Sequence, residues 1–307
     1  MNYTLRQLQI FLKITQKQSV TKASEELHLT QPAVSIQLKN FQDQFPIPLT
    51  EIVGRKLYVT EFGQEIASAA EKILEEVASI DYKTLAYQGQ LSGRLIVSVV
   101  STAKYVMPYF LSDFMKSNTG VELIMDVTNK SRVVKSLERN EVDFALVSVL
   151  PKKLKVNRVE LMPNRLFYVA STDLTFENKP SKKKLFEDLP LIYREEGSAT
   201  RNAMETFIAK NEFSVTQKIE LTSNEAVKQA VISGLGCSIM PLIGIKNELK
   251  NKDVQIVPIR GLPITTAWNL IWLKSKNLSP IATAFLDFIS SEKETIIKKK
   301  FDWIDSF

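Results

Sequence analysis

Apolar residues in the first part of the chain recur at intervals of three and four, which places them on one face of an α-helix. Over residues 4–17 this face consists of Leu5, Leu8, Phe11, Leu12 and Thr15. A second, short helix is predicted next, with Thr21 as its N-cap. Its packing face is made of mostly small side chains, Ala23, Ser24 and Leu27. Small side chains allow the two helices to cross closely.

A third helix is predicted to begin after His28 and Leu29 interrupt the pattern. Thr30 is a suitable N-cap, and Pro32 falls in the first turn, where its missing N–H costs nothing. Its apolar positions are Ala33, Val34, Leu38, Phe41 and Phe45, which leaves Gln31, Ser35, Gln37, Lys39 and Asn40 on the outer face. A tight two-helix corner with such an outer face is typical of a helix that enters the DNA major groove. An ordinary helical corner with a solvated polar face is the alternative.

A short hairpin is predicted over residues 53–60, with Arg55 and Lys56 at its tip. Beside a groove-reading helix, these basic residues suit contact with phosphates or the minor groove. From Thr60 to about Gln88 the helical spacing continues without a proline, which predicts one long helix. Such a helix cannot bury its apolar stripe against the three short N-terminal helices alone, so we expect it to pair with the same helix of a second copy of the chain. An internal helix of one compact domain is the alternative.

After Gly93 short apolar runs alternate with helical stripes, an order typical of parallel α/β units. Strands are predicted at 95–100, 121–127, 143–149, 166–170, 190–193, 219–221, 237–240 and 268–273, and helices at 107–117, 132–140, 202–211, 223–233 and 281–290. We expect two lobes with a cleft between them. Ligands of such sheets bind outside the carboxyl ends of the strands.

Polar residues that suit a small anion follow the predicted strands in both lobes. Ser101 and Thr102 come directly after the first strand, and Arg194, Gly197, Ser198, Thr200 and Arg201 precede a helix predicted to begin near Asn202. Hydroxyls, helix N-terminal amides and guanidinium groups bind carboxylate, phosphate or sulfate. Thr128, Asn129 and Ser148 are weaker candidates. Each residue alone is equally explained as a helix cap, so the prediction depends on the two lobes converging.

Composition narrows the chemistry further. The 307 residues are 44% hydrophobic, which is enough for two or more ordinary domains. The single cysteine, Cys237, and the single histidine, His28, disfavour disulfides, a metal site and a nucleophile–base pair. We therefore expect no cofactor. The N-terminus has neither the pattern of a signal peptide nor that of a membrane span, so a cytoplasmic protein is predicted. The net charge of +6 permits a nucleic-acid partner without indicating where it binds.

The chain resembles the LysR-type transcriptional regulators. The resemblance is most specific in LRQLQIFLKI, in SVTKASEELHLTQPAVSIQLKNF and in GRKLYVTEFG, while the remainder matches in layout. It implies a winged helix-turn-helix, a linker-helix dimer and a two-lobed effector domain like the periplasmic binding proteins, commonly assembled as a tetramer. It also implies that Gln31, Pro32 and Ser35 sit at the DNA and that Ser101, Thr102, Thr128 and Thr200 line the inducer cleft. Two positions depart from the family pattern: Ile36, where many members carry arginine, and Thr50, where phenylalanine is usual.

The prediction as a whole is an α/β protein with an all-α winged helix-turn-helix over 1–60, a linker helix over 61–90 and an effector domain over 91–307. Lobe I is expected at about 91–164 and 269–307, and lobe II at about 165–268. The side chains expected at double-stranded DNA are Thr30, Gln31, Pro32, Ser35, Gln37, Lys39, Arg55 and Lys56. Those expected at a small, anionic effector are Ser101, Thr102, Thr128, Asn129, Ser148, Arg194, Thr200 and Arg201. A homodimer or homotetramer without a membrane partner is expected.

Two other functions remain open from the residues alone. One is a metabolite-binding module without a role in transcription, and the other is an α/β enzyme with a helical appendage. The basic segment from Ser291 to Phe307 is expected to be either a subunit contact or a docked terminus. Loss of the inducer response is expected for Thr200→Val and for Arg201→Ala.

Overall fold

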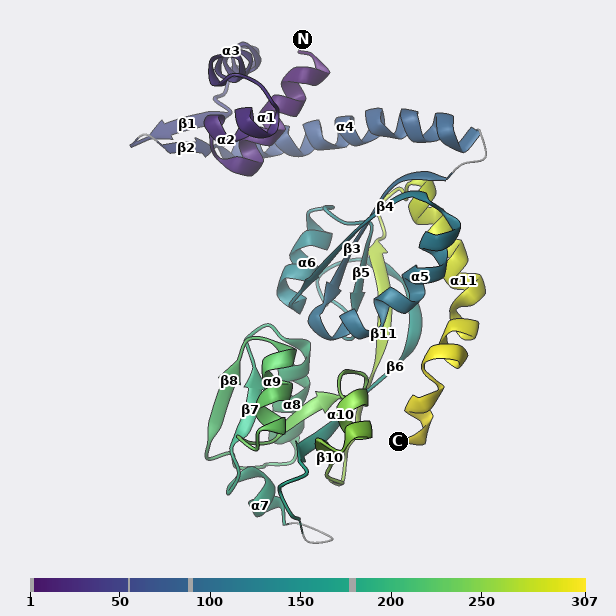
Figure 1. The fold of residues 1–307 in the computed structure, drawn as a ribbon. Helices are drawn as coiled ribbons and strands as arrows, with labels where there is room; N and C mark the ends of the chain where they lie inside the picture. The colour runs from purple at the N-terminus through teal and green to yellow at the C-terminus, as the bar shows by residue number, and fades with distance from the viewer. Residues whose placement is uncertain (1–2, 55, 88–90, 177–180) are drawn as a thin grey trace. The chain divides into compact units, whose positions relative to one another are not determined.

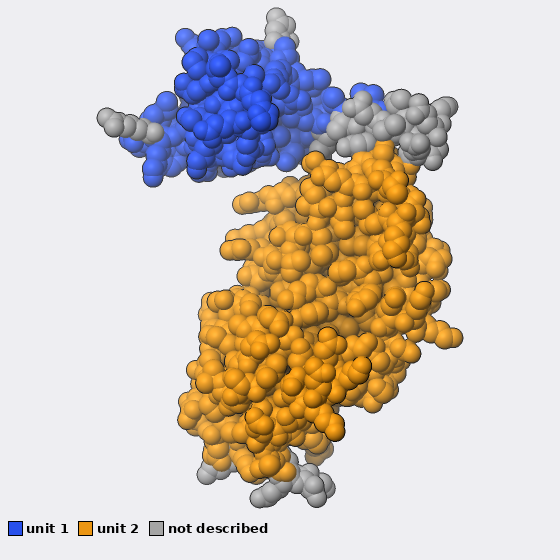
Figure 2. Space-filling model, in the orientation of Figure 1, with its two compact units in different colours: residues 1–89 blue, residues 90–307 orange. Residues whose placement is uncertain are grey.

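The structure is a computed structural model that describes residues 3–54, 56–87, 91–176 and 181–307. The chain separates into two compact units, residues 1–89 and residues 90–307, coloured separately in Figure 2. Each unit has hydrophobic clusters of its own. The division supports a small N-terminal head with its own core and a larger C-terminal domain.

The N-terminal unit contains four helices and a two-stranded hairpin among its described residues (Figure 1). The elements are α1 (Leu5–Lys17), α2 (Val20–Glu26), α3 (Gln31–Gln42), β1 (Thr50–Val53), β2 (Lys56–Val59) and α4 (Glu61–Tyr87). Thr4 caps α1 and Thr30 caps α3 through their hydroxyls. The predicted cap of α2 at Thr21 is wrong, because the Ser19 hydroxyl accepts the Lys22 N–H at 3.3 Å. Helix α2 therefore begins one residue before Thr21, which lies in its first turn.

Two small clusters hold the helices of the head together. One joins Phe11, Phe41 and Leu49 to Ala67 and Ala70 of α4, and all five side chains are buried. The other joins Ile10 and Ile14 to Ala23 of α2 and Val34 of α3. The small Ala23 side chain is fully buried, as expected for a close helix crossing. His28 occupies the turn before α3 with a φ of 52°, but its side chain is exposed.

Strands β1 and β2 form the antiparallel hairpin, or wing, that the sequence predicts. Thr50, the departure from the family pattern, fastens the wing to α3. Its hydroxyl donates to Gln42 Oε1 at 2.8 Å, and its backbone N–H donates to the same oxygen at 3.1 Å. These hydrogen bonds supply a polar attachment in place of the packing that an aromatic side chain would provide there.

Helix α4 confirms the predicted long helix and is 27 residues long. The Thr60 hydroxyl caps it by accepting the Gly63 N–H at 2.9 Å. Phe62, Ile66 and Leu74 pack against the head in addition to the two buried alanines. Farther along the helix, Ile73 and Ile80 are 41% and 60% exposed. The head thus covers the first part of the apolar stripe and leaves these two isoleucines uncovered.

A seven-stranded mixed sheet runs through the C-terminal unit in the order β10-β6-β11-β5-β3-β4, with β9 also paired to β6. The strands are β3 (Ser92–Val100), β4 (Gly120–Thr128), β5 (Phe144–Val147), β6 (Val156–Ser171), β9 (Ser238–Pro241), β10 (Val254–Ile256) and β11 (Ile264–Leu273). Strand β3 pairs in parallel with β4 and β5, as predicted, whereas β11 runs antiparallel to β5 and β6. A separate parallel pair is formed by β7 (Leu191–Arg194) and β8 (Lys218–Leu221).

Helices cover the sheet on both faces, giving the layered α/β architecture seen in Figure 1. Lobe I carries η1 (Ser101–Tyr105), α5 (Met107–Ser117), α6 (Lys130–Glu138) and α11 (Pro280–Lys300). Lobe II carries α7 (Lys182–Phe186), α8 (Ala199–Lys210), α9 (Asn224–Ile232), η2 (Leu242–Gly244) and α10 (Lys246–Asn251). Helices α6 and α8 begin two and three residues earlier than the sequence pattern predicts. Consequently Lys130 and Thr200 lie in first helical turns and not in loops.

Two long strands, β6 and β11, run through both lobes. Residues 156–171 form one strand, where the sequence predicts only 166–170, and its partner β11 covers 264–273. Pro163 and Asn164 interrupt the apolar run, which hid the first half of β6 from the pattern. The lobe boundaries expected near residues 164 and 268 fall within these strands. Their pairing shifts register between Trp268 and Asn269.

The basic C-terminal segment is docked on lobe I. Helix α11 continues to Lys300, ten residues beyond the predicted end at Ser290, and η3 (Asp302–Ser306) follows. Phe301 and Ile304 are buried, and Arg165 donates to the Ile304 carbonyl oxygen at 3.0 Å. These contacts favour the docked terminus over the subunit contact as the role of this segment.

Candidate functional site

The outer face of α3 presents hydrogen-bonding side chains to solvent. Gln31, Pro32 and Lys39 are exposed, Thr30 at the N-cap is exposed, and Ser35 and Gln37 are half-buried. Gln31 Nε2 donates to Ser35 Oγ at 3.1 Å, so the two side chains are ordered as a pair. The opposite face, with Val34 and Phe41, is buried in the head. The structure therefore leaves the polar face of α3 available to a partner, as the sequence predicts.

The basic tip of the wing is described in part. Lys56 begins β2 and is exposed. Arg55 lies outside the described residues. Gly54, which precedes it, has a φ of 55°, a left-handed value that suits glycine in a tight turn.

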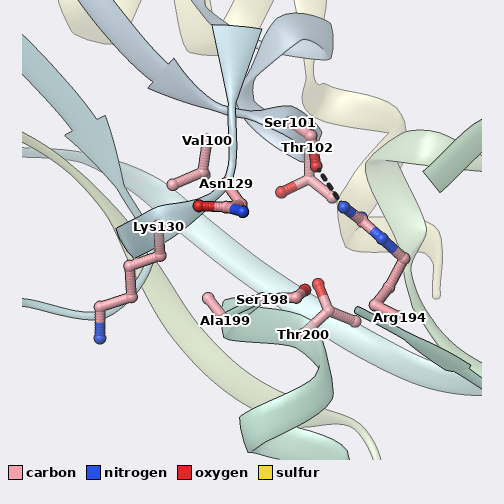
Figure 3. A pocket seen from close by; sticks show the side chains of 9 residues that line it. All are labelled: Val100, Ser101, Thr102, Asn129, Lys130, Arg194, Ser198, Ala199 and Thr200. Carbon is pink, nitrogen blue, oxygen red and sulfur yellow. Dashed lines mark hydrogen bonds between the residues drawn. The ribbon is translucent and has the colours of Figure 1, made fainter. Parts of the chain in front are cut away.

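A crevice lies between the two lobes of the C-terminal unit, at the ends of β3 and β4 (Figure 3). Its cavity volume is only about 10 Å³, so the lobes leave little free space between them. The lining residues are Val100, Ser101, Thr102, Asn129, Lys130, Arg194, Ser198, Ala199 and Thr200. Among the described residues, no carboxylate lines this crevice. Five of the eight predicted effector residues are in this set: Ser101, Thr102, Asn129, Arg194 and Thr200.

Helix N-termini from both lobes meet at this crevice. Asn129 caps α6 and Ser198 caps α8, while η1 begins at Ser101. The first amides of a helix have no carbonyl partner within the helix and carry partial positive charge. The crevice therefore combines hydroxyls, free amides and a positive field, a combination that binds an anion.

Arg194 lies at the crevice, but its guanidinium is already paired. It donates to Glu195 through Nε at 2.8 Å and Nη2 at 2.9 Å, to Asn224 Oδ1 at 3.0 Å and to Ser101 Oγ at 3.0 Å. The dashed line in Figure 3 marks the bond to Ser101. The Arg194 side chain is 4% exposed. Its geometry suits holding the lobes and Ser101 in place, while Arg194 also lines the crevice, as the sequence predicts.

Three predicted effector residues lie outside the crevice lining. Arg201 pairs with Glu205 at 2.8 Å and Glu220 at 2.6 Å and donates to the Arg194 carbonyl oxygen. These partners, all on lobe II, hold its guanidinium within that lobe. Thr128 ends β4, and Ser148 is buried after β5. Neither hydroxyl reaches the lining.

Lys130 is a lining residue that the sequence reasoning missed. It is the first residue of α6, and Figure 3 shows it across the crevice from Arg194. It forms no salt bridge with any described residue. Burial lowers the pKa of its amine below the usual value, and the nearby charge of Lys152 lowers it further. A lysine at a helix N-terminus opposes the helix dipole, which is the signal that could have identified it.

The lobes approach closely beside the crevice at Gly197 and Ser131. Gly197 has a φ of 83°, and a Cβ atom there would lie 2.6 Å from Ser131 Oγ. A second contact between the lobes is the hydrogen bond that Tyr105 Oη donates to Glu225 Oε2 at 3.2 Å. The structure thus holds the two lobes in a closed arrangement around a narrow space.

The described residues form neither a metal-ion cluster nor a membrane-spanning helix. Within the described ranges, no cluster of three or more His, Cys, Asp or Glu side chains is arranged to hold a metal ion. None of the helices in the described part of the chain has the length and hydropathy needed to cross a membrane.

Comparison with known proteins identifies both units. Residues 5–64 match the family model "Bacterial regulatory helix-turn-helix protein, lysR family", and residues 88–293 match "LysR substrate binding domain". The RuBisCO operon transcriptional regulator of Allochromatium vinosum is 36% identical, over 95% of this chain and 97% of its own length. The transcriptional activator CmpR of Synechocystis is 35% identical, over 96% of this chain and 97% of its own length.

A solved structure is similar to the C-terminal unit. It is the CcmR regulatory domain of Synechocystis PCC6803 in complex with 2-PG. It is 32% identical, with a TM-score of 0.62, and covers 66% of this chain and 98% of its own. Together with the winged head, the closed crevice and the two family matches, these similarities show that the chain belongs to the LysR family of DNA-binding transcriptional regulators.

Proposed function

We propose that this protein regulates transcription in response to a small phosphorylated carboxylic acid bound in the crevice between its lobes. The observation that carries the proposal is the meeting of the α6 and α8 N-termini with Lys130 at one crevice. Among the described residues, Lys130 has no salt-bridge partner and no carboxylate lines the crevice. Such a site favours an anion with several acceptor oxygens.

The described residues suggest how the two charged ends of the effector would be held. The amides and hydroxyls of Ser198, Ala199 and Thr200 form one anion-binding end, and Ser101 and Thr102 form another. Lys130 supplies a positive charge at the rim of the crevice, on a flexible four-carbon side chain that can turn toward a bound anion. Arg194 contributes indirectly by holding Ser101, and Arg201 is excluded from the proposed site.

2-Phosphoglycolate is the first compound to test. The solved relative that is 32% identical carries 2-PG in its regulatory domain. A phosphate and a carboxylate on a two-carbon chain match the two anion-binding ends, and the lobes must separate to admit the compound, because the crevice has a volume of only about 10 Å³. Binding of this compound by the present chain is part of the proposal.

The DNA-binding surface is proposed to be the outer face of α3 together with the wing. Thr30, Gln31, Pro32, Ser35, Gln37 and Lys39 are the residues assigned on the helix, and Lys56 and Arg55 on the wing. Polar residues early in a recognition helix reach base edges, and lysines at its margin contact phosphates.

The active form is proposed to be a homodimer or a homotetramer. Ile73 and Ile80 are one heptad apart on α4 and are both exposed, which suits an antiparallel or parallel pairing of two such helices. Two heads held by paired α4 helices would contact two half-sites. We further propose a cytoplasmic location, where the protein meets DNA, and a binding role without catalysis, which the relatives' names as regulators support.

The test uses the full chain and the DNA upstream of its own gene. We expect sequence-specific binding that weakens steeply with salt, and a 2-phosphoglycolate-dependent change in the footprint or the Kd. Glycolate and inorganic phosphate, each carrying one of the two anionic groups, are the matched controls. Specific DNA binding without a response to 2-phosphoglycolate would overturn the proposed effector. Absence of specific DNA binding would overturn the proposed mode of regulation.

A further inference from the structure

One apolar side chain stands in the middle of the polar face of α3. Ile36 is 58% exposed, while the other aliphatic residues of this helix are buried, as Val34 is, or half-buried, as Leu38 is. Helix α3 is described in full, so this contrast covers all of its twelve residues. A branched aliphatic side chain gains nothing from facing water, and on this otherwise polar face Ile36 is available for an apolar contact.

The neighbours of Ile36 identify the kind of partner. On a helix, residues three and four apart are adjacent. Pro32 therefore lies on one side of Ile36, and Lys39 and Asn40 lie on the other; all three are exposed. Ser35, which accepts the Gln31 amide, is next in sequence. Three of these neighbours, Pro32, Ser35 and Lys39, are side chains that we assign to DNA.

Base pairs in the major groove offer one apolar group, the C5-methyl of thymine. Against any other base, an aliphatic side chain would find no apolar surface to pack on. It would also displace water from the hydrogen-bonding groups of that base. We infer that Ile36 is a specificity-determining residue that packs against a thymine methyl in each half-site of the operator. This inference rests on the proposed function, because it requires α3 to lie in the major groove.

The experiment removes the methyl group from the DNA and the side chain from the protein. The wild-type footprint first defines the bound sequence, and each thymine in a half-site is then replaced by deoxyuridine, which keeps base pairing and loses only the C5-methyl. We expect one position at which this replacement raises the wild-type Kd about fourfold, the equivalent of one buried methyl group. Ile36→Ala should raise the Kd for thymine DNA and should abolish the difference between thymine and deoxyuridine at that position.

Two further variants separate this inference from its alternatives. Lys39→Ala, on the same face, should weaken binding to both DNAs equally and keep the fourfold ratio, since a phosphate contact does not sense the methyl. Ile36→Val retains part of the aliphatic surface and should retain part of the ratio. The thermal unfolding midpoint of Ile36→Ala should match that of the wild type, because alanine suits an exposed helical position.

Specific binding by the wild type with no position sensitive to deoxyuridine would overturn the role of Ile36 and leave the proposed function standing. An unchanged thymine preference in Ile36→Ala would overturn it equally. A shift of Ile36→Ala to a smaller oligomer, with the preference intact, would assign the residue to a subunit contact instead. Failure of the wild type to bind any DNA specifically would overturn the proposed function and this inference together.

Discussion

Arg194 of lobe II donates a hydrogen bond to Ser101 of lobe I across 3.0 Å, at the edge of the crevice. The same guanidinium is held by Glu195 and by Asn224, so its direction is fixed before any ligand arrives. Ser101 begins the 3₁₀ turn that lines the crevice. The Arg194 guanidinium, which the sequence predicts at the ligand, thus orients the neutral Ser101 hydroxyl. Among the described residues that line the crevice, Lys130 is the cation left to meet an anion.

Lys130→Ala is expected to weaken 2-phosphoglycolate binding strongly. Loss of a charge-assisted hydrogen bond costs about 1.5–3 kcal/mol, roughly 10- to 150-fold in Kd. Isothermal titration calorimetry on the full chain measures this directly. The matched variant is Lys152→Ala, an exposed lysine outside the crevice lining, which should change the binding free energy by about 0–1 kcal/mol. Equal losses in the two variants would show that overall charge, and not Lys130, governs affinity.

The affinity for an anionic effector should fall at alkaline pH. Only the protonated Lys130 amine attracts the anion, and its pKa is lowered from 10.5 by burial and by Lys152. As the pH rises through this lowered pKa, the charge is lost, so the decline in affinity should begin at a lower pH than for an ordinary lysine. In Lys130→Arg the charge persists over the whole range. Its pH profile should therefore be flat, and a profile identical to the wild type would contradict the assignment.

Gly197→Ala is expected to disturb closure of the lobes. The new Cβ would lie 2.6 Å from Ser131 Oγ on α6, in addition to the strain of a φ of 83°. Gly234→Ala is the matched control, because its φ is 76° but nothing lies within 4 Å of the new Cβ. Both variants should lose about 1 kcal/mol of unfolding free energy from backbone strain. Only Gly197→Ala should also weaken effector binding, as measured by the ligand-dependent shift in Tm; equal shifts in both would exclude the clash.

Gln31→Ala and Ser35→Ala should each weaken specific DNA binding by about 1–3 kcal/mol per lost base contact. Because Gln31 donates to Ser35 at 3.1 Å, each side chain also orients the other. The double variant should therefore lose less than the sum of the two single losses. Fluorescence anisotropy with the footprinted DNA gives the three free energies. Gln16→Ala, exposed on α1, should bind as the wild type does.

Ile73→Lys combined with Ile80→Lys is expected to reduce the mass of the protein in solution. Both side chains are exposed in the single chain, so their replacement should cost little folding free energy. At a helix–helix interface, however, two added charges would be buried without partners. Light scattering after size-exclusion chromatography measures the mass. Lys72→Ala, exposed beside Ile73, is the control and should keep the mass of the wild type; an unchanged mass in the double variant would place the subunit contact elsewhere.

Local pattern was enough to predict most of the fold. The helical stripes of the head, the Thr30 cap, the long α4 and the parallel strands β3 and β4 depend on neighbouring residues, and the structure contains them all. The first half of β6 was missed because Pro163 and Asn164 interrupt its apolar run. The predicted starts of α6 and α8 fall two and three residues too late because polar caps and, in α6, a lysine open these helices.

The candidate site was harder to predict than the fold. Residues that follow strands identified Ser101, Thr102, Asn129 and Thr200, all of which line the crevice. The roles of the two arginines depend in part on hydrogen bonds to residues that are distant in the sequence. Asn224 is thirty residues from Arg194 and Glu220 is nineteen from Arg201, and these partners determine that neither guanidinium is free. Glu195 and Glu205, one and four residues from these arginines, were visible as partners in the sequence, whereas Asn224 and Glu220 were not.

Because β6 and β11 each belong to both lobes, cuts near residues 164 and 268 would sever both strands in mid-ladder. Strands β9 and β10, which pair with residues 166–171, would stay with lobe II, but the continuity of the two long strands with lobe I would be lost. A chimaera designed to change what the regulator senses should therefore exchange residues 91–307 as a single cassette.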